Sequence, residues 1–333
     1  MWLIAVGLAF AADTKTDKPA EKTDPPPVKM GGVIFAHYGY DLTEGADGYN
    51  EFAVDRAYLT AQASLTKKLA TRLTLDADRF KSTTLPDDSS VTVDTKYRVF
   101  VKHAYLEWKD AAPGVKARFG MVDTPYTPYF DSLWGHRYLM ESFAKQNKVL
   151  DTADLGVSVQ GEHAKGLVSW NAALLNGEGY GKLEMNAGKA VQARVTIDPL
   201  APKKGPNLPI TGFVSYNGDP DSEATLTYAG ALGFKHKYVF AWGEYLGTQK
   251  GEAAAGGYSF SVLPRMPDVG GLVFRYDHWD PSNDGTGDST TTLVGGVDHD
   301  FYERVSAAVT YERLMPEEGS ATQGVFLRMQ AGF

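Results

Sequence analysis

Polar and apolar residues alternate one by one in many short segments of this sequence after residue 31. In the segment 56–65, the residues at even positions are Arg, Tyr, Thr, Gln and Ser, and those at odd positions are Ala, Leu, Ala, Ala and Leu. A β-strand with this period of two places all its polar side chains on one face and all its apolar side chains on the other. The pattern therefore predicts strands that separate water from an apolar environment.

Sixteen segments of this kind follow one another, and a helical pattern stands out in only one place, at 132–146. Strand segments are rich in β-branched and aromatic residues, and Gly, Asp, Ser and Pro gather between them. The predicted strands are 32–40, 52–65, 69–80, 97–109, 115–122, 153–163, 166–175, 190–198, 209–217, 223–234, 237–247, 256–264, 270–279, 290–299, 303–313 and 322–333.

The connectors between these segments alternate in length. Those after even-numbered segments are mostly short, whereas those after odd-numbered segments are mostly long, as at 81–96 and 123–152. Connector 199–208 is longer than this rule expects, and connector 218–222 is shorter. Short turns at one end and long loops at the other are typical of outer-membrane barrels, whose strand number is even. We therefore predict an all-β fold, a 16-stranded antiparallel transmembrane β-barrel over residues 30–333.

A soluble β-propeller or β-sandwich would also show alternation. Its apolar faces would point into a core and be rich in Val, Ile and Leu, whereas here they contain much Ala and Gly. Aromatic residues, 12% of the chain, tend to lie near segment ends, as interfacial girdles do. No blade-like repeat is present. The membrane barrel is thus the favoured prediction, and the soluble β-protein remains an alternative.

The N-terminus differs from the rest of the chain. Residues 2–12 form the longest apolar run, too short for a transmembrane helix of about 20 residues, and the run contains Ala9-Phe10-Ala11. This small-x-small pattern predicts a signal peptide at 1–11, although no Lys or Arg precedes the run; a buried N-terminal strand is the alternative. Residues 12–29 are charged and Pro-rich, which predicts a disordered periplasmic leader.

Several function classes are disfavoured by composition. The chain has no Cys, which excludes thiolate metal sites and a Cys nucleophile, and its formal charge of −8 argues against a nucleic-acid binder. The histidines lack metal-ligand spacing, and no G-x-S-x-G motif is present. We therefore expect no metal, no cofactor and no enzymatic activity.

Four stretches carry a resemblance to a known family: NEFAVDRAYLTAQASL at 50–65, HAYLEWKD at 103–110, VKARFGMVDTPY at 115–126 and DTADLGVSVQGE at 151–162. With these stretches the chain resembles bacterial outer-membrane porins, and most closely the phosphate-selective porin O/P family. The resemblance implies a sixteen-stranded, often trimeric, diffusion channel. The last strand ends in Phe333, which resembles the signal that such proteins present to the barrel-assembly machinery.

The polar faces of the predicted strands would line the pore, where charge and radius set selectivity. By parity, similar numbers of cations and anions face inward, and each charge could instead be neutralised by an opposite charge on a neighbouring strand. The predicted inward cations are Arg56, Arg72, Lys116, Arg118, Arg194, Arg275, Arg304 and Arg328, and the predicted inward anions are Asp76, Asp78, Glu107, Asp154, Glu162, Asp277 and Glu312.

The longest connector, 123–152, is the third outer loop, and the porin resemblance implies that it folds inward and narrows the channel. A helix at 132–146 would pack Leu133, Tyr138, Met140, Phe143 and Ala144 against the wall. The charged residues expected to face the passage are Asp131, Arg137, Glu141, Lys145 and Lys148. The alternative is that this loop is an outer lid.

Phosphate-selective members of the family use rows of Arg and a cluster of Lys, which acidic residues dilute here. The sequence thus predicts a porin surrounded by lipid in the outer membrane of a Gram-negative bacterium, and the resemblance implies a homotrimer. Small hydrophilic or ionic solutes, with phosphate as a possible anion, would diffuse through its water-filled channel. A plugged barrel acting as an adhesin or membrane enzyme is the alternative.

Overall fold

The computed structural model describes residues 25–79, 96–184, 186–201, 205–220, 222–267 and 269–333. The predicted signal peptide and most of the predicted leader lie outside these residues. The first strand begins at Val28, so Val28 and Lys29, expected to belong to the leader, are strand residues.

The described residues form sixteen strands, two short α-helices and one 3-10 turn. Every predicted strand segment has a counterpart, with ends shifted by a few residues. The strands are β1 (Val28–Asp41), β2 (Asn50–Ser64), β3 (Leu69–Arg79), β4 (Tyr97–Ala112), β5 (Val115–Asp123), β6 (Ala153–His163), β7 (Val168–Leu175), β8 (Ala190–Ile197), β9 (Ile210–Asn217), β10 (Thr225–His236), β11 (Val239–Lys250), β12 (Ala253–Met266), β13 (Gly270–Asp280), β14 (Thr290–Tyr302), β15 (Val305–Pro316) and β16 (Thr322–Gly332); the helical elements are α1 (Thr127–Trp134), α2 (Phe143–Gln146) and η1 (Ala164–Gly166).

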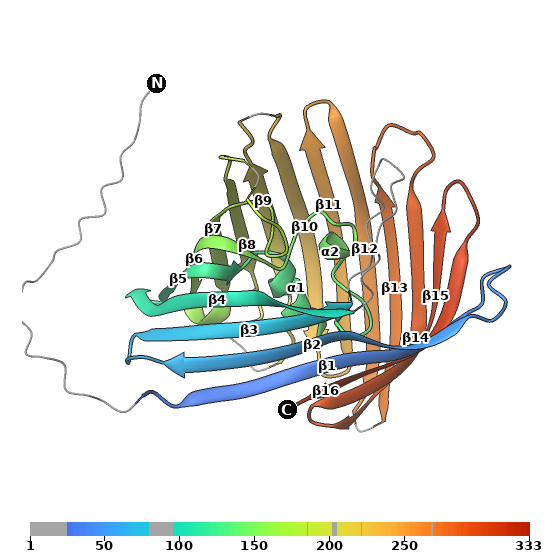
Figure 1. Cartoon of the computed structure of the whole chain (residues 1–333), viewed down its shortest axis with the longest axis horizontal. Coiled ribbons are helices and arrows are strands. Elements are labelled where there is room, and N and C mark those ends of the chain that lie inside the picture. Colours follow the sequence, from blue (N-terminus) through green and yellow to red (C-terminus); the bar gives the residue numbers. More distant parts are fainter. Residues whose placement is uncertain (1–24, 80–95, 185, 202–204, 221, 268) are drawn as a thin grey trace, which may run out of the picture.

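Each strand pairs antiparallel with the next, and β1 pairs with β16, so the sheet closes into a barrel (Figure 1). The closing register runs from Val33 opposite Gly332 to Asp41 opposite Gly324. Closure leaves no strand edge with unpaired backbone groups, which a sheet in hydrocarbon requires. The predicted sixteen-stranded antiparallel barrel is confirmed.

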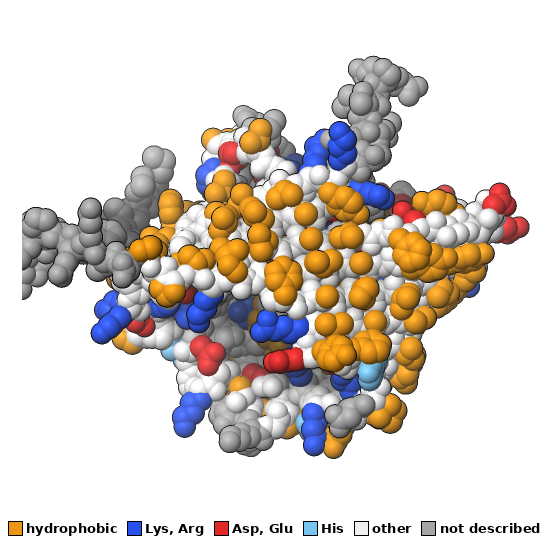
Figure 2. Space-filling model, turned by 60° about the horizontal axis from the view of Figure 1, so that its bottom comes forward, with side chains coloured by type: hydrophobic (Ala, Val, Ile, Leu, Met, Phe, Trp, Pro, Cys, Tyr) orange, Lys and Arg blue, Asp and Glu red, His pale blue; other side chains and the backbone are white. Residues whose placement is uncertain are grey.

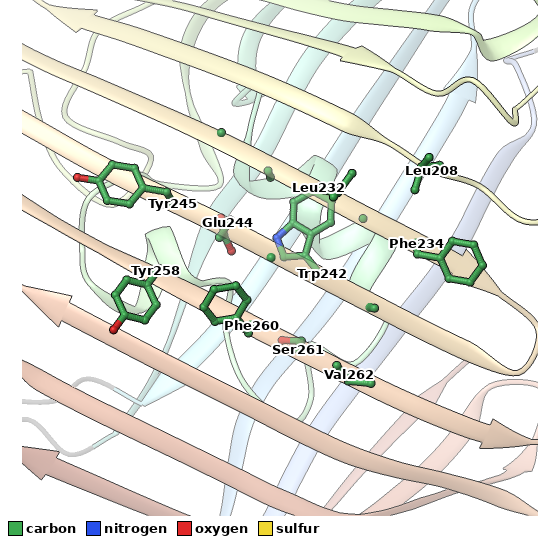
Figure 3. Close-up of a pocket in the computed structure, with 15 residues that line it drawn as sticks. Leu208, Leu232, Phe234, Trp242, Glu244, Tyr245, Tyr258, Phe260, Ser261 and Val262 are labelled. Atoms are coloured by element: carbon green, nitrogen blue, oxygen red, sulfur yellow. The ribbon is translucent and has the colours of Figure 1, made fainter.

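Side chains alternate between the two faces of this wall, as the sequence pattern predicts. On β11, Tyr245 is 46% exposed on the outer face, whereas Trp242 and Glu244 are buried on the inner face (Figure 3). Apolar side chains cover much of the outer wall in the view of Figure 2. Tyr258 and Phe260 of β12 border an apolar hollow of about 670 Å³ on this outer face.

In the long connector between β8 and β9, one side chain bonds to the described residues on both sides. The carboxylate of Asp198 accepts hydrogen bonds from the backbone N–H groups of Leu200, Ala201 and Leu208, at 2.9–3.1 Å, and from the side chain of Asn207 at 2.9 Å. Asp198 therefore links the two described parts of this connector, 199–201 and 205–209.

Among the described residues, four pairs of strands shift register, and the shift between β3 and β4 places an extra residue on β4. Thr74 pairs with His103 and the next residue, Leu75, pairs with Val101, so Lys102 is the extra residue on β4. Because a bulge interrupts the period of two, Lys102 and His103 are both buried although they are adjacent in sequence.

The predicted helix at 132–146 is wrong in its extent. Helix α1 starts earlier, with Pro128 in its first turn, where a missing N–H costs no hydrogen bond. It ends at Gly135, which has a φ of 68° and therefore adopts the left-handed conformation that stops a helix. Helix α2 begins after Ser142 and has only four residues.

Candidate pore constriction

The segment 124–152 connects β5 to β6 and carries the three largest fully buried side chains among the described residues, Tyr126, Phe130 and Phe143. Phe130 and Trp134 of α1 pack edge-on against Trp242 of β11 and Phe240 of β11, with ring centroids 5.3 and 6.0 Å apart. Further along, Phe143 packs in a second cluster with residues of β9, β10 and β11. These aromatic contacts fix one face of the segment on the inner wall.

Polar contacts add to this attachment. The hydroxyl of Tyr126 donates a hydrogen bond of 2.5 Å to Glu244 Oε2 on β11. On β8, Arg194 Nε donates to the carbonyl of Pro125 at 2.9 Å, and on β13, Arg275 Nη1 donates to the carbonyl of Glu141 at 2.8 Å. The segment is therefore bonded to three inner-wall strands as well as packed against them.

The opposite side of the segment contacts β2. Arg56 Nη2 lies 3.4 Å from Glu141 Oε1, and the Arg137 guanidinium lies 5.7 Å from the centre of the Tyr58 ring. In the closed sheet, β2 and β10 are half-way round the barrel from each other. The segment thus contacts inward-facing side chains on opposite sides of the wall.

Charges alternate around this contact. Arg56 Nη1 lies 3.1 Å from both Asp76 Oδ2 and Asp78 Oδ2, whereas Arg137 lies 3.5 Å from Asp131 and 3.6 Å from Glu141. Cations and carboxylates therefore face each other between β2–β3 and the loop.

A second group of ion pairs lines β4 and β5. Arg118 lies 2.9 Å from Glu107 and 2.7 Å from Asp123, and His103 Nε2 lies 2.8 Å from Asp123. The alternative in which lumen charges are neutralised by neighbouring strands describes these pairs well.

Five of the predicted pore residues are brought together here, namely Arg56, Asp131, Arg137, Glu141 and Arg275. Lys145 pairs with Asp151 within the same loop. The remaining predicted residues lie outside this group. Arg72 and Arg118 line the β3–β5 wall, and Arg194 is buried against Pro125 and the Tyr129 ring. Lys116 and Lys148 are exposed.

Two residues of the inner wall, Lys102 and Tyr58, were not among the predicted pore residues. Lys102 is 4% exposed and donates a hydrogen bond of 3.1 Å to the Tyr58 hydroxyl, with its ammonium 4.5 Å from the centre of that ring. The parity of the predicted strand 97–109 assigned Lys102 to the outer face, and only the bulge turns it inward. Tyr58 stood on the polar face of its strand and could have been included.

Burial changes the acidity of the loop side chains. Burial raises the pKa of Asp131 above its ordinary value, although the positive charge of Arg137 opposes this shift. For Lys145, burial lowers the pKa, but the charge of Asp151 and its hydrogen bond outweigh burial, so the pKa is raised. The pKa of each group is thus set by burial together with the charge of its nearest partner.

Within the described part of the chain, no helix combines the length and the apolar character needed to cross a bilayer. Over the same residues, no group of three or more His, Asp or Glu side chains has an arrangement that could hold a metal ion.

The described residues form a closed sixteen-stranded antiparallel β-barrel, and the loop after β5 is hydrogen-bonded to β8, β11 and β13. The chain is similar in structure to the anion-selective porin of Comamonas acidovorans, with a TM-score of 0.65 and 12% identity over 93% of this chain and 100% of that one. It is also similar to Salmonella typhi OmpF in complex with daunomycin, with a TM-score of 0.67 and 11% identity over 92% and 98% of the two chains. A third similar structure is the trimer form of OmpT, an outer membrane protein of Vibrio cholerae, with a TM-score of 0.60 and 12% identity over 93% and 100%.

At these identities the likeness concerns the fold. No family model matches the sequence, and no curated protein matches it.

Proposed function

We propose that this protein is an outer-membrane porin of a Gram-negative bacterium, through which small hydrophilic or ionic solutes diffuse passively. The observation that carries the proposal is the separation of side chains across the closed wall. Leu59 of β2 and Leu73 of β3 are about 40% exposed on the outer face, whereas their neighbours Arg56 and Arg72 face the interior. An apolar exterior and a charged interior suit a barrel with lipid outside and water inside.

In this proposal, segment 124–152 narrows the passage. Its aromatic face is packed on β9–β13, and its charged face, with Arg137 and Glu141, lies toward β2. Solutes would pass between opposed rows of charge, which favours small polar molecules over apolar ones.

A plugged barrel that serves as an adhesin or membrane enzyme is the second candidate. It is favoured by one observation, the direct contact between Arg56 and Glu141, which joins the loop to the far wall. The abundance of charged and hydroxyl side chains on the inner face supports the channel instead, because a plugged lumen needs no hydrated surface.

A more specific proposal concerns which ions pass through the channel. The similar structure from Comamonas acidovorans is an anion-selective porin, and Arg56, Lys102 and Arg137 lie along the same stretch of wall and loop. We infer a modest preference for anions, with phosphate among them, because Asp76, Asp131 and Glu141 neutralise part of this charge.

A homotrimer is proposed for the assembled state, since a similar structure is a trimer form. The apolar outer wall would supply both the contacts between copies and the contacts with lipid. Light scattering of the detergent-solubilised protein, corrected for bound detergent, distinguishes a trimer from a monomer.

The proposed function is tested by single-channel recording of refolded protein in a planar bilayer across a KCl gradient. Stable open steps are expected, and the reversal potential gives the sign of selectivity. Reproducible insertion without conductance would reject the porin and favour the plugged barrel. A mature chain that remains soluble without detergent would reject both.

A further inference from the structure

A separate cavity lies between the loop after β5 and the inner wall of β1–β4. Its volume is about 430 Å³, which is within the range of small-molecule sites. Side chains of the loop, including Arg137, close one side, and side chains of β1 to β4 form the other. The cavity is therefore assembled only when the loop is docked.

The lining of this cavity has two chemically different parts. Val33 and Phe35 of β1, with the ring of Tyr58, form an apolar surface. Arg72 of β3 and Lys102 of β4 bring positive charge to the same cavity. An apolar surface beside fixed cations matches a ligand that has an apolar body and one anionic group.

No carboxylate among the described residues lies at ion-pair distance from the buried ammonium of Lys102. Its contacts are the Tyr58 hydroxyl at 3.1 Å and the rings of Tyr58 and Tyr180 at 4.5 and 5.8 Å. Aromatic rings compensate a cation only partly, since such contacts are weaker than a buried ion pair.

The second cation of the cavity, Arg72, has similar polar surroundings. Its Nε donates a hydrogen bond of 3.0 Å to Thr74 Oγ1, and within the described part of the chain no carboxylate lies at ion-pair distance from it. Thr74 is 2% exposed, so the guanidinium is held beside a buried hydroxyl.

The two acidic residues of the cavity are already engaged. Asp123 is paired with Arg118 at 2.7 Å and with His103 at 2.8 Å, and Asp131 lies 3.5 Å from Arg137. Among the described residues, Lys102 and Arg72 thus remain without a carboxylate at ion-pair distance in a confined space. Because an uncompensated charge away from water is costly, this arrangement favours an anion from solution.

We propose that the cavity binds small organic monocarboxylates with an aromatic or aliphatic body, such as benzoate. The carboxylate accepts hydrogen bonds from Lys102 and Arg72, and the body lies against Phe35 and the Tyr58 ring. A planar carboxylate can take two parallel hydrogen bonds from a guanidinium. The inference rests on the proposed function, since it names a class of solute for the same channel.

Inorganic phosphate fits the lining less well. Phosphate satisfies the cations but leaves the surface of Val33 and Phe35 facing water, whereas an apolar body removes that surface from water. Acetate carries the correct charge but covers little apolar surface. The order of affinity expected is therefore benzoate above acetate and above phosphate.

The test is isothermal titration calorimetry of the full chain refolded in detergent, with sodium benzoate, sodium acetate and sodium phosphate as separate titrants. Benzoate is expected to bind, and Lys102→Met, which keeps the length of the side chain, is expected to weaken it about tenfold or more. Arg72→Gln provides a second, independent variant with the same expected direction. Lys67→Met removes one charge from the exposed β2–β3 turn and is the matched control.

The inference is overturned if benzoate does not bind, or if it binds equally well to Lys102→Met and Arg72→Gln. Equal affinity for phosphate and benzoate would also overturn it, because the apolar surface would then have no role. Single-channel recording separates the two proposals. Conductance without benzoate binding rejects this site alone, whereas benzoate binding without conductance rejects the porin alone.

Discussion

Arg56 on β2 and Glu141 on the loop after β5 lie 3.4 Å apart, measured from Nη2 to Oε1, although 85 residues separate them in the chain. Arg56 is also paired with Asp76, and Glu141 also lies 3.6 Å from Arg137. This chain of alternating charges joins the barrel wall to the loop that packs on the opposite side.

Removing the negative charge of Glu141 should shift ion selectivity toward anions. In Glu141→Gln, Arg56 loses its carboxylate partner on the loop, and Asp131 is the remaining described carboxylate at ion-pair distance from Arg137. The reversal potential across a KCl gradient should move in the direction of higher chloride permeability. Glu303→Gln removes an equal charge from the exposed β14–β15 turn and should leave the reversal potential unchanged. An equal shift in both variants would show that total charge, rather than this contact, sets selectivity.

Acidification should increase anion preference through Asp131. Burial raises the pKa of this carboxyl, so it loses its negative charge at a higher pH than an ordinary Asp does. As the pH falls through that range, Arg137 becomes less neutralised and chloride permeability should rise. Selectivity measured at several pH values should show this step in the wild type and a smaller one in Asp131→Asn. An identical pH profile in both proteins would rule out Asp131 as its source.

A charge on the outer face of β2 should destabilise the inserted barrel. Leu59 is 40% exposed on the face that carries the apolar side chains, and Leu59→Arg should cost about 2–4 kcal/mol if the residue lies near the bilayer midplane. Reversible unfolding in lipid vesicles measures this cost. Leu59→Phe keeps an apolar side chain and should differ little from the wild type. An unchanged stability in Leu59→Arg would place this residue away from lipid.

The seam between the first and last strands should not tolerate a side chain at Gly32. Gly32 and Phe333 exchange two backbone hydrogen bonds of 3.0 Å, and a Cβ on Gly32 would meet the Phe333 ring and lie 2.6 Å from the Tyr58 carbonyl oxygen. Gly32→Ala should therefore lower the free energy of unfolding by about 1–3 kcal/mol. Gly230→Ala on β10 is the matched control, because a Cβ there meets open space. Equal stability of the two variants would contradict tight packing at the seam.

Alternation predicted the barrel because the contrast between the two sides of a strand is a local property. In 56–65, each residue type already shows which side meets the interior, and the alternating connector lengths give the hairpin order. Arg56 and Arg72 were assigned to the interior for this reason. Lys102 was not, because the β-bulge that turns it inward depends on the register between β3 and β4.

The sequence by itself determined the strand number, the antiparallel order and the polar inner face, since these follow from a period of two and from turn chemistry. The tertiary structure alone decided which charges meet. In the folded chain, Arg194 donates a hydrogen bond to the carbonyl of Pro125, and Lys102 lines a cavity with Arg72 and Arg137. The physical reason is that loop docking depends on aromatic packing between residues far apart in the chain, as between Phe130 and Trp242, and no local pattern encodes such a contact.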